Sequence, residues 1–256
     1  LTAEWMRVGY THGNMNSDNC LMCGKTLDYG PFAFMEAYSD SFQPFTSDHT
    51  GYYSFSRQPE AAQANARSFA TALLALCKEP AQRTELEGVL EEVVETDFAV
   101  EFQRAHHSAC LAKLGLLTWD DETRSLWEEL LQLMEKSEAD FTVFFRLLQS
   151  WPTDASCGLL HFERAFGSGL PSDNIAQAWG VWLERFAVLV AAHGEPAHIR
   201  CERMRRASPK YVPRNWMLME AYDAAARGDF TPVQGLLGML TRPYDEQPEF
   251  EEAYFR

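Results

Sequence analysis

Apolar residues recur every three or four positions along most of the chain after residue 58, which is the spacing of one buried face of an α-helix. The clearest stretch carries Leu86, Val89, Leu90, Val93, Val94, Phe98 and Phe102. The pattern predicts helices over 61–78, 84–112, 120–136, 139–148, 173–192, 196–206, 212–226 and 231–240. Pro59 suits the first turn of the first helix, and Gly115 suits the end of the second. The chain is therefore expected to be mainly α-helical.

The first 58 residues follow a different pattern. Residues 5–10 are strand-like, and residues 19–22 and 26–29 are predicted to form two strands joined by a turn at 23–25. An apolar stretch at 31–35 then precedes a polar, turn-rich stretch at 39–56. A short β-hairpin and a long irregular segment are therefore expected ahead of the helices.

The loop before this hairpin carries residues at the spacing of a protein-kinase catalytic loop. That loop is written H-R-D-x-x-x-x-N, and its metal motif is D-F-G. Here His12 and Asn19 keep the separation of the first and last residues, and Asp28-Tyr29-Gly30 has the form of the metal motif. Asn14 stands at the position of the kinase Asp and cannot accept a proton, whereas Asp18 adds a carboxylate beside Asn19.

These residue types suit a magnesium site with a neighbouring base. Mg²⁺ prefers hard oxygen ligands, which the Asn19 amide and the Asp28 carboxylate supply from the two ends of the predicted hairpin. Asp18 is placed to accept a proton from an attacking hydroxyl. The alternative is an ordinary loop of turn-forming residues in which Asp18 is only a cap.

The order of segments after the loop also follows the kinase order. Gln58-Pro59-Glu60 occupies the place of the A-P-E motif that closes an activation segment. We therefore predict a single kinase-like C-lobe region over 1–256. Its parts are a catalytic loop and Asp-Tyr-Gly hairpin at 1–30, an activation-type segment at 31–58, and helices at 59–256.

Several strings make the chain resemble the C-terminal part of the selenoprotein O family, once called a pseudokinase and now considered a protein adenylyltransferase. They begin with Thr26-Leu27-Asp28-Tyr29-Gly30-Pro31-Phe32, Ser47-Asp48-His49-Thr50-Gly51-Tyr52-Tyr53 and Gln58-Pro59-Glu60. Later ones are Ala139-Asp140-Phe141-Thr142, Pro209-Lys210-Tyr211-Val212-Pro213-Arg214-Asn215 and Arg242-Pro243-Tyr244-Asp245-Glu246-Gln247-Pro248. The chain departs from the family pattern at His49, Tyr52 and Pro213.

The resemblance implies Mg²⁺-dependent transfer of AMP from ATP to Ser, Thr or Tyr hydroxyls of proteins. It implies that Asp18 is the proton acceptor and that Asn19 and Asp28 are the magnesium ligands. Asp28 would also lie near the nucleotide phosphates. The compartment implied is mitochondrial in a eukaryote and cytoplasmic in a bacterium.

The resemblance also implies that the nucleotide-binding lobe lies upstream of these residues. We therefore expect a fragment that comprises a kinase-like C-lobe with extra C-terminal helices, lacks the N-lobe, and is inactive alone.

Charge and composition exclude some partners. The net charge of −15 opposes binding to nucleic acid or to anionic membrane surfaces, both of which attract basic proteins. No apolar run is expected to span a bilayer. A hydrophobic content of 46% indicates a globular chain. We therefore expect ATP and hydroxyl-bearing proteins as partners, without nucleic acid or membrane.

Other motifs are weaker. Cys20 and Cys23 form a lone C-x-x-C, which suits a strand and turn better than a redox or zinc site. His106 and Cys110 lie one helical turn apart, but two ligands do not make a metal site. One basic cluster has two equally supported interpretations. It either contacts a phosphate or the activation segment, or it forms salt bridges to the acidic helices. Its residues are Arg203, Arg205, Arg206, Lys210 and Arg214.

Two other functions stay open at this point. Phosphorylation on the same scaffold is the first, because nucleotide orientation would be set upstream. A non-catalytic helical interaction module is the second, and it predicts no Mg²⁺-dependent ATP binding.

Overall fold

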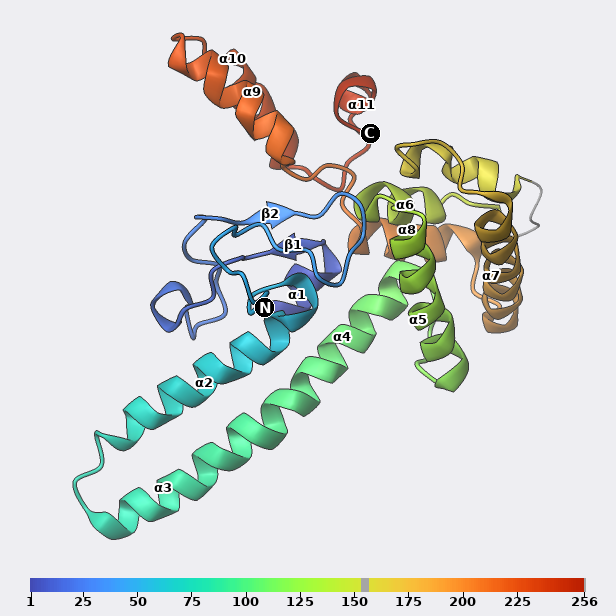
Figure 1. The fold of residues 1–256 in the computed structure, drawn as a ribbon. Helices are drawn as coiled ribbons and strands as arrows, with labels where there is room; N and C mark the ends of the chain where they lie inside the picture. Colours follow the sequence, from blue (N-terminus) through green and yellow to red (C-terminus); the bar gives the residue numbers. More distant parts are fainter. Residues whose placement is uncertain (153–156, 256) are drawn as a thin grey trace. The chain divides into compact units, whose positions relative to one another are not determined.

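The computed structural model describes residues 1–152 and 157–255. The helices observed are α1 Thr2–Arg7, α2 Gln58–Leu74, α3 Pro80–Glu92, α4 Phe98–Leu114, α5 Asp121–Lys136, α6 Phe141–Leu148, α7 Asp173–His193, α8 Ala197–Ala207, α9 Asn215–Ala226, α10 Thr231–Leu240 and α11 Pro248–Tyr254 (Figure 1). The strands are β1 Tyr10–Thr11 and β2 Ala33–Phe34. Short 3₁₀ turns occur at Ser17–Asn19, Phe55–Arg57 and Gly158–Ala165, and a π-helical turn at Val93–Asp97. The prediction of a mainly α protein is confirmed.

The described chain divides into two compact units. Unit 1 comprises Leu1–Met6, Tyr10–Phe32 and Ser41–Ser108. Unit 2 comprises Arg7–Gly9, Ala33–Asp40 and Ala109–Arg256. The predicted catalytic loop and most of the activation-type segment belong to unit 1.

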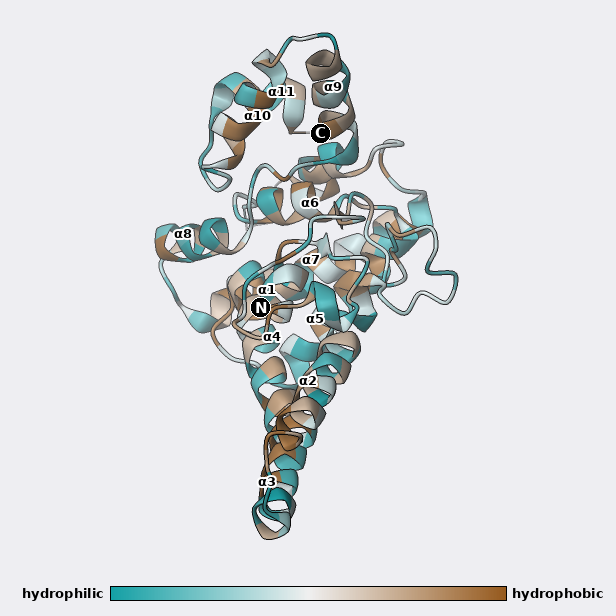
Figure 2. Ribbon diagram, turned by 90° about the vertical axis from the view of Figure 1, so that its left-hand side faces the viewer, coloured by the Kyte–Doolittle hydropathy of each residue, from teal (hydrophilic) through white to brown (hydrophobic). Residues whose placement is uncertain are grey.

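In unit 1, α2 packs against α3 and the π-helical turn to form a helical hairpin (Figure 1). Val94 is buried, and its carbonyl accepts a hydrogen bond of 2.9 Å from the Gln63 side chain of α2. The helix predicted over 84–112 is thus confirmed, although it begins at Pro80 and contains the π-helical turn. Figure 2 shows hydrophilic and hydrophobic residues interspersed along α2 and α3.

Aromatic side chains form the core of unit 2. Phe144 of α6 packs 4.9 Å from the Phe162 ring and 5.1 Å from the Trp179 ring, measured between centroids. Trp182 of α7 stacks on Phe186 at 5.3 Å, and its indole nitrogen donates to the Leu126 carbonyl at 2.8 Å. The donated bond satisfies the one polar atom that this burial removes from water.

Helix α7 is long and apolar. It has 21 residues and a mean hydropathy of 1.3 in its most apolar window, so length and composition alone would allow it to cross a membrane. The prediction that no apolar run reaches this length is therefore wrong for α7. A core helix passes the same test, and α7 buries Trp179, Trp182 and Phe186 within unit 2.

The basic residues of α8 and of the segment between α8 and α9 pair with acids of the same unit. Arg205 lies 2.7 Å from Glu202, and Arg214 holds Asp140 through two bonds of 2.6 and 3.0 Å. The remaining pairs are Arg203–Glu195, Arg206–Glu202, Lys210–Glu246 and Lys210–Glu251. Each of these basic residues therefore makes a salt bridge, as one of the two interpretations expected, but to acids outside the acid-rich helices α3 and α5.

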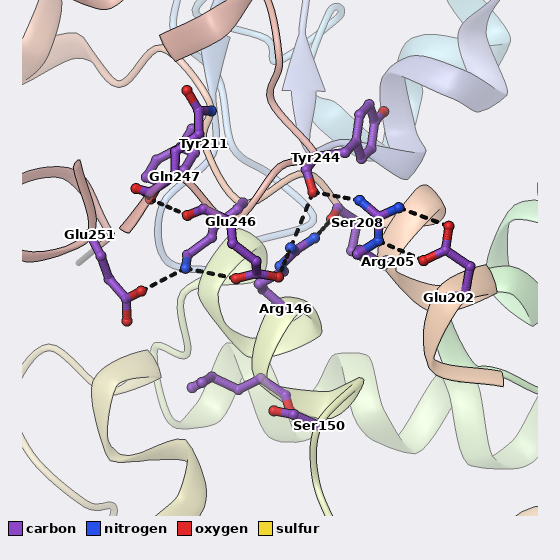
Figure 3. Close-up of polar contacts among 12 residues, drawn as sticks. Arg146, Ser150, Glu202, Arg205, Ser208, Tyr211, Tyr244, Glu246, Gln247 and Glu251 are labelled. Carbon is purple, nitrogen blue, oxygen red and sulfur yellow. Dashed lines mark hydrogen bonds and ion pairs between the residues drawn. The ribbon is translucent and has the colours of Figure 1, made fainter. Parts of the chain in front are cut away.

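Two buried cations hold the segment that leads into α11 (Figure 3). Arg146 of α6 is 3% exposed and donates to the Ser208 carbonyl at 3.2 Å and to the Tyr244 carbonyl at 3.1 Å. Both Arg146 and Lys210 also contact the Glu246 carboxylate. Because each cation has several acceptors, its burial does not leave it unpaired.

Lys113, near the end of α4, is another buried cation of unit 2 and is 2% exposed. Its ammonium donates to the Arg7 carbonyl at 2.9 Å and lies 3.9 Å from the centroid of the Phe145 ring. Burial removes water from the ammonium, and Arg7 repels it, so the pKa of Lys113 falls well below its usual value. Folding therefore favours the neutral amine.

This burial predicts a pH-dependent stability. Unfolding raises the pKa of Lys113 back to about 10.4, so the unfolded chain binds more protons and the unfolding free energy rises with pH up to that value. In Lys113→Met, this dependence should be lost. Urea unfolding of both proteins at a series of pH values between 7 and 10 measures the difference, with exposed Lys136→Met as the control. A difference between wild type and Lys113→Met that stays constant with pH would contradict the assignment.

Candidate functional site

A buried glutamine fixes the position of the predicted catalytic loop in unit 1. Gln58, the first residue of α2, is fully buried, and its amide oxygen accepts a hydrogen bond of 3.0 Å from the His12 backbone N–H. Its amide nitrogen donates to the Tyr10 carbonyl at 3.0 Å and to the Phe55 carbonyl at 3.3 Å. The start of α2 thus holds the backbone at and just before the loop's first residue, His12.

The His12 side chain extends this anchoring to the predicted metal motif. Its Nε2 lies 2.9 Å from the Leu27 carbonyl, and its Nδ1 accepts from the Asn14 N–H at 3.4 Å. These partners assign the tautomer with the proton on Nε2. The imidazole therefore joins the residue before Asp28 to the loop that carries Asp18.

Gly13 is required by its surroundings. Its φ of +79° is strained for residues with a side chain, and a Cβ there would lie 2.8 Å from the Pro31 carbonyl oxygen. The same Cβ would lie 3.0 Å from the Pro44 ring. The loop can therefore approach the activation-type segment only because this position is glycine.

The predicted hairpin at 19–29 is wrong in its strands. A turn closes with the Gly24 N–H donating to the Leu21 carbonyl at 3.2 Å, but neither flank is a strand. Asp28 has a φ of +61°, which an extended strand does not allow. Side chains fix the segment instead, including Trp5, whose indole donates to the Thr26 hydroxyl at 2.9 Å.

Residues 5–10 also differ from the strand predicted for them. Thr2–Arg7 form α1, and only Tyr10–Thr11 are extended. Trp5 lies with its ring 5.4 Å from both the Tyr10 and the His12 rings, so packing around the loop determines this local structure more than the apolar run does.

Asp18 and Asn19 lie in the 3₁₀ turn Ser17–Asn19. The carboxylate-bearing residue Asp18 is exposed, whereas Asn19 is half-buried and donates its amide to the Asn14 carbonyl at 3.1 Å. This bond directs the amide oxygen of Asn19 away from Asn14. His12 and Asn14 therefore hold both the Asp18–Asn19 turn and the backbone next to Asp28.

Asp28 lies in the left-handed region and its carboxylate folds back over Gly30. Both carboxylate oxygens are 3.4 Å from the place where a Cβ of Gly30 would lie, which is an ordinary van der Waals contact. The pKa of Tyr10 is raised by burial and further by Tyr29 and the Asp28 charge. This coupling puts the Asp28 carboxylate within electrostatic reach of the buried Tyr10 hydroxyl.

The predicted ligand pair consists of one amide and one carboxylate. Among residues 1–152 and 157–255, no three His, Cys, Asp or Glu side chains gather as they would around a metal ion. The described cysteines, which include Cys20, Cys23 and Cys110, are free thiols. The donor chemistry of Asn19 and Asp28 fits Mg²⁺, which takes few protein ligands and completes its shell with water and phosphate oxygens.

Asn65 was missed by the sequence analysis. It is buried within α2 and donates to the Met15 carbonyl at 2.8 Å, while its side-chain oxygen accepts from the Ser17 hydroxyl at 3.0 Å. Asn is unfavourable in the interior of a helix. An Asn within the amphipathic stretch of α2 was therefore the sequence signal that this residue has a special structural role.

The activation-type segment contacts the loop through Tyr53. Its hydroxyl donates to the Asn16 side-chain oxygen at 2.7 Å, and its backbone N–H donates to Asp48 at 2.8 Å. Asp48 also accepts from Gln43 at 2.6 Å and from Thr50 at 3.1 Å, and although burial opposes the shift, these donors lower its pKa. The segment is therefore held in one conformation next to the turn that carries Asp18.

Comparison with known proteins gives one consistent family. The family model described as "Protein adenylyltransferase SelO" matches residues 1–241. A protein nucleotidyltransferase YdiU of Bordetella avium is 39% identical over 99% of this chain and 48% of the relative. Relatives of the same description from Xanthomonas campestris and Rhodopirellula baltica are both 36% identical, over 98% and 97% of this chain and 47% of each relative. The chain spans about half the length of the curated relatives it matches.

Removing the Gln58 amide should loosen the loop. In Gln58→Leu, the His12 N–H and the Tyr10 and Phe55 carbonyls lose their partner, at a cost of about 1–3 kcal/mol for each group left buried without one. Hydrogen exchange read by mass spectrometry should quicken in peptides covering 10–20. Gln63→Leu, also on α2, removes only the bond to Val94 and should leave these peptides unchanged. Unaltered exchange in Gln58→Leu would show that the loop is held by other contacts.

Proposed function

Because this chain belongs to the protein adenylyltransferase SelO family, we propose that it is the kinase-like catalytic C-lobe of a Mg²⁺-dependent protein adenylyltransferase. The co-substrates would be ATP and a protein with a Ser, Thr or Tyr hydroxyl. The observation that carries the proposal is the His12 imidazole, which connects the Asp18–Asn19 turn to the backbone before Asp28. A merely turn-rich loop has no need of this buried connection.

The proposed reaction is transfer of AMP to an oxygen atom. The acceptor hydroxyl oxygen attacks the α-phosphorus, the bond from that phosphorus to the α–β bridging oxygen breaks, and pyrophosphate leaves. The hydroxyl proton passes to the Asp18 carboxylate, which is exposed and thus accessible to an acceptor on another protein. Asp18 serves as the base because Asn14 carries an amide, which is not basic.

The other two residues would hold the nucleotide through its metal ion. Asn19 would present its amide oxygen, since its amide nitrogen is occupied by the Asn14 carbonyl. Asp28 would present its carboxylate, which lies next to Gly30 because the Asp28 backbone is left-handed. Bound Mg²⁺ supplies charge neutralisation on the phosphate oxygens. The chain's own contribution is to fix these oxygens relative to Asp18 through His12.

Protein phosphorylation is the second candidate, favoured by the kinase-like spacing of His12 and Asn19. The position of the transferred label distinguishes the two. In a protein that contains this chain and a nucleotide-binding lobe, label from α-³²P ATP should appear on the acceptor protein, and label from γ-³²P ATP should not. Transfer of the γ label would show that the reaction is phosphorylation and not adenylylation. Calorimetry without any Mg²⁺-dependent ATP binding, in the same protein, would instead support a non-catalytic helical module.

Substitution should separate the roles of the two acids. Asp28→Ala should abolish Mg²⁺-dependent ATP binding in calorimetry, because it removes a charged ligand. Asp18→Ala should keep ATP binding and lower transfer by about 10²–10⁴-fold, the range for loss of a general base. Exposed Asp223→Ala on α9 is the control and should change neither quantity. Full transfer activity in Asp18→Ala would reject this carboxylate as the base.

A further inference from the structure

Most of the turn that carries the proposed base lies in water. Ser17 and Asp18 are exposed, and Asn19 is half-buried. The turn closes through one backbone bond of 2.9 Å, from the Asn19 N–H to the Asn16 carbonyl. That bond shapes the turn but does not attach it to a helix. Because exposed side chains gain no fixed position from apolar burial, hydrogen bonds to other segments have to determine where the turn lies.

Two hollows of unit 1 adjoin the turn. The larger has a volume of about 400 Å³ and is lined by Asn19 and Cys20. The smaller has a volume of about 180 Å³ and is lined by Asn16 and Ser17. Both ends of the turn therefore border open space. Asn65 of α2 lines both hollows, so its side chain lies where each end of the turn meets the helix.

Asn65 is bonded to both ends of the turn. Its amide nitrogen donates to the Met15 carbonyl at 2.8 Å, and its amide oxygen accepts from the Ser17 hydroxyl at 3.0 Å. The same nitrogen donates to the Cys20 thiol at 3.2 Å. Two of these partners precede the proposed base, and the third follows the proposed amide ligand. One buried side chain thus holds the chain before and after the two functional residues.

The charge of Asp18 acts on one of these partners. Burial raises the pKa of the Cys20 thiol, the hydrogen bond from Asn65 opposes this rise, and the Asp18 charge adds to it. The Asp18 carboxylate therefore lies within electrostatic reach of a side chain that Asn65 holds.

Helix α2 supplies two anchors to the loop. Gln58, which holds the His12 backbone, and Asn65 are seven positions apart, so they project from one face of the helix two turns from each other. Tyr53 of the activation-type segment reaches the turn at Asn16, whereas Asn65 reaches it on both sides of the functional residues. The rigid helix thus fixes the turn as well as the first residue of the loop.

We propose that Asn65 is a positioning residue for AMP transfer. It holds the turn so that the Asp18 carboxylate meets the acceptor hydroxyl and the Asn19 amide oxygen meets the metal ion. Asn65 itself touches neither substrate nor metal. The inference rests on the proposed function, because it takes Asp18 as the base. It adds a residue of α2 that no part of the catalytic-loop motif contains.

Hydrogen exchange tests the anchor without any reaction. Asn65→Leu keeps the approximate size of the side chain and removes all three bonds, so exchange should quicken in peptides covering 15–20. Gln63→Leu makes the same kind of change on α2, where the amide bonds to Val94, and should leave these peptides unchanged. Equal exchange of 15–20 in wild type and Asn65→Leu would overturn the anchor.

Rates of α-label transfer test the catalytic consequence, in a protein that contains this chain and a nucleotide-binding lobe. At saturating ATP and Mg²⁺, Asn65→Leu should lower transfer by about 10–100-fold, the range for residues that orient metal ligands. Gln63→Leu should transfer at the wild-type rate. An unchanged rate in Asn65→Leu would reject the positioning role.

Ser17 gives a second test that does not disturb the buried helix face. Ser17→Ala removes one of the three bonds from an exposed position and should lower transfer about fivefold. Ser17→Thr keeps the hydroxyl and should restore the rate. Equal rates in Ser17→Ala and Ser17→Thr would contradict the contribution of this bond.

A double-mutant cycle separates positioning from a general loss of folded protein. If Asn65 acts through the base, Asn65→Leu should lower transfer by less than about twofold once Asp18→Ala has removed that base. A purely structural effect would instead lower transfer by the same factor in both backgrounds, and that result would overturn the inference.

The outcomes also distinguish this inference from the proposed function. Absence of α-label transfer in the wild-type protein would remove adenylylation and the catalytic role of Asn65 together, whatever the exchange experiment shows. Transfer of the α label that depends on Asp18 and is indifferent to Asn65→Leu would keep adenylylation and remove only the positioning residue.

Discussion

The hydrogen bonds of the Gln58 side chain are the interaction on which the candidate site depends. One amide joins the start of α2 to backbone groups of His12 and Tyr10, which are more than 45 positions away in the sequence. His12 in turn positions Leu27 and Asn14, and Asn14 positions Asn19. The backbone beside both proposed ligands is thus linked, through His12 and Asn14, to a side chain that would touch neither metal nor substrate.

Unit 2 uses charge in a different way. Its buried Arg146 and Lys210 are surrounded by carbonyls and carboxylates of the same unit, including Glu246, which both contact. Such cations contribute by holding irregular backbone in place and have little surface left for a ligand. The strings that carry family resemblance therefore include both the proposed metal ligand Asp28 and residues that hold the backbone around Glu246.

The sequence predicted the helices in which apolar residues recur at regular spacing. The helix at 231–240 has the predicted bounds, because the spacing of its apolar residues is that of one helix face. The hairpin failed because its segment is fixed by side-chain bonds to distant backbone, and because Asp28 turns into the left-handed region. Gln58 and Asn65 were not foreseen as anchors, since their partners lie far away in sequence and leave no periodic signal. Asp18, Asn19 and Asp28 were found from residue type and spacing, and their roles stay predictions.

The free thiol of Cys23 has a practical consequence. This cysteine is exposed on the turn between Asn19 and Asp28, whereas Cys110 is buried. A spin label or fluorophore attached there, with exposed Cys157 replaced by serine, would sit on the short connection between the two oxygen-bearing residues. A label on this turn would report on the proposed nucleotide binding and would leave Asp18, Asn19 and Asp28 chemically intact.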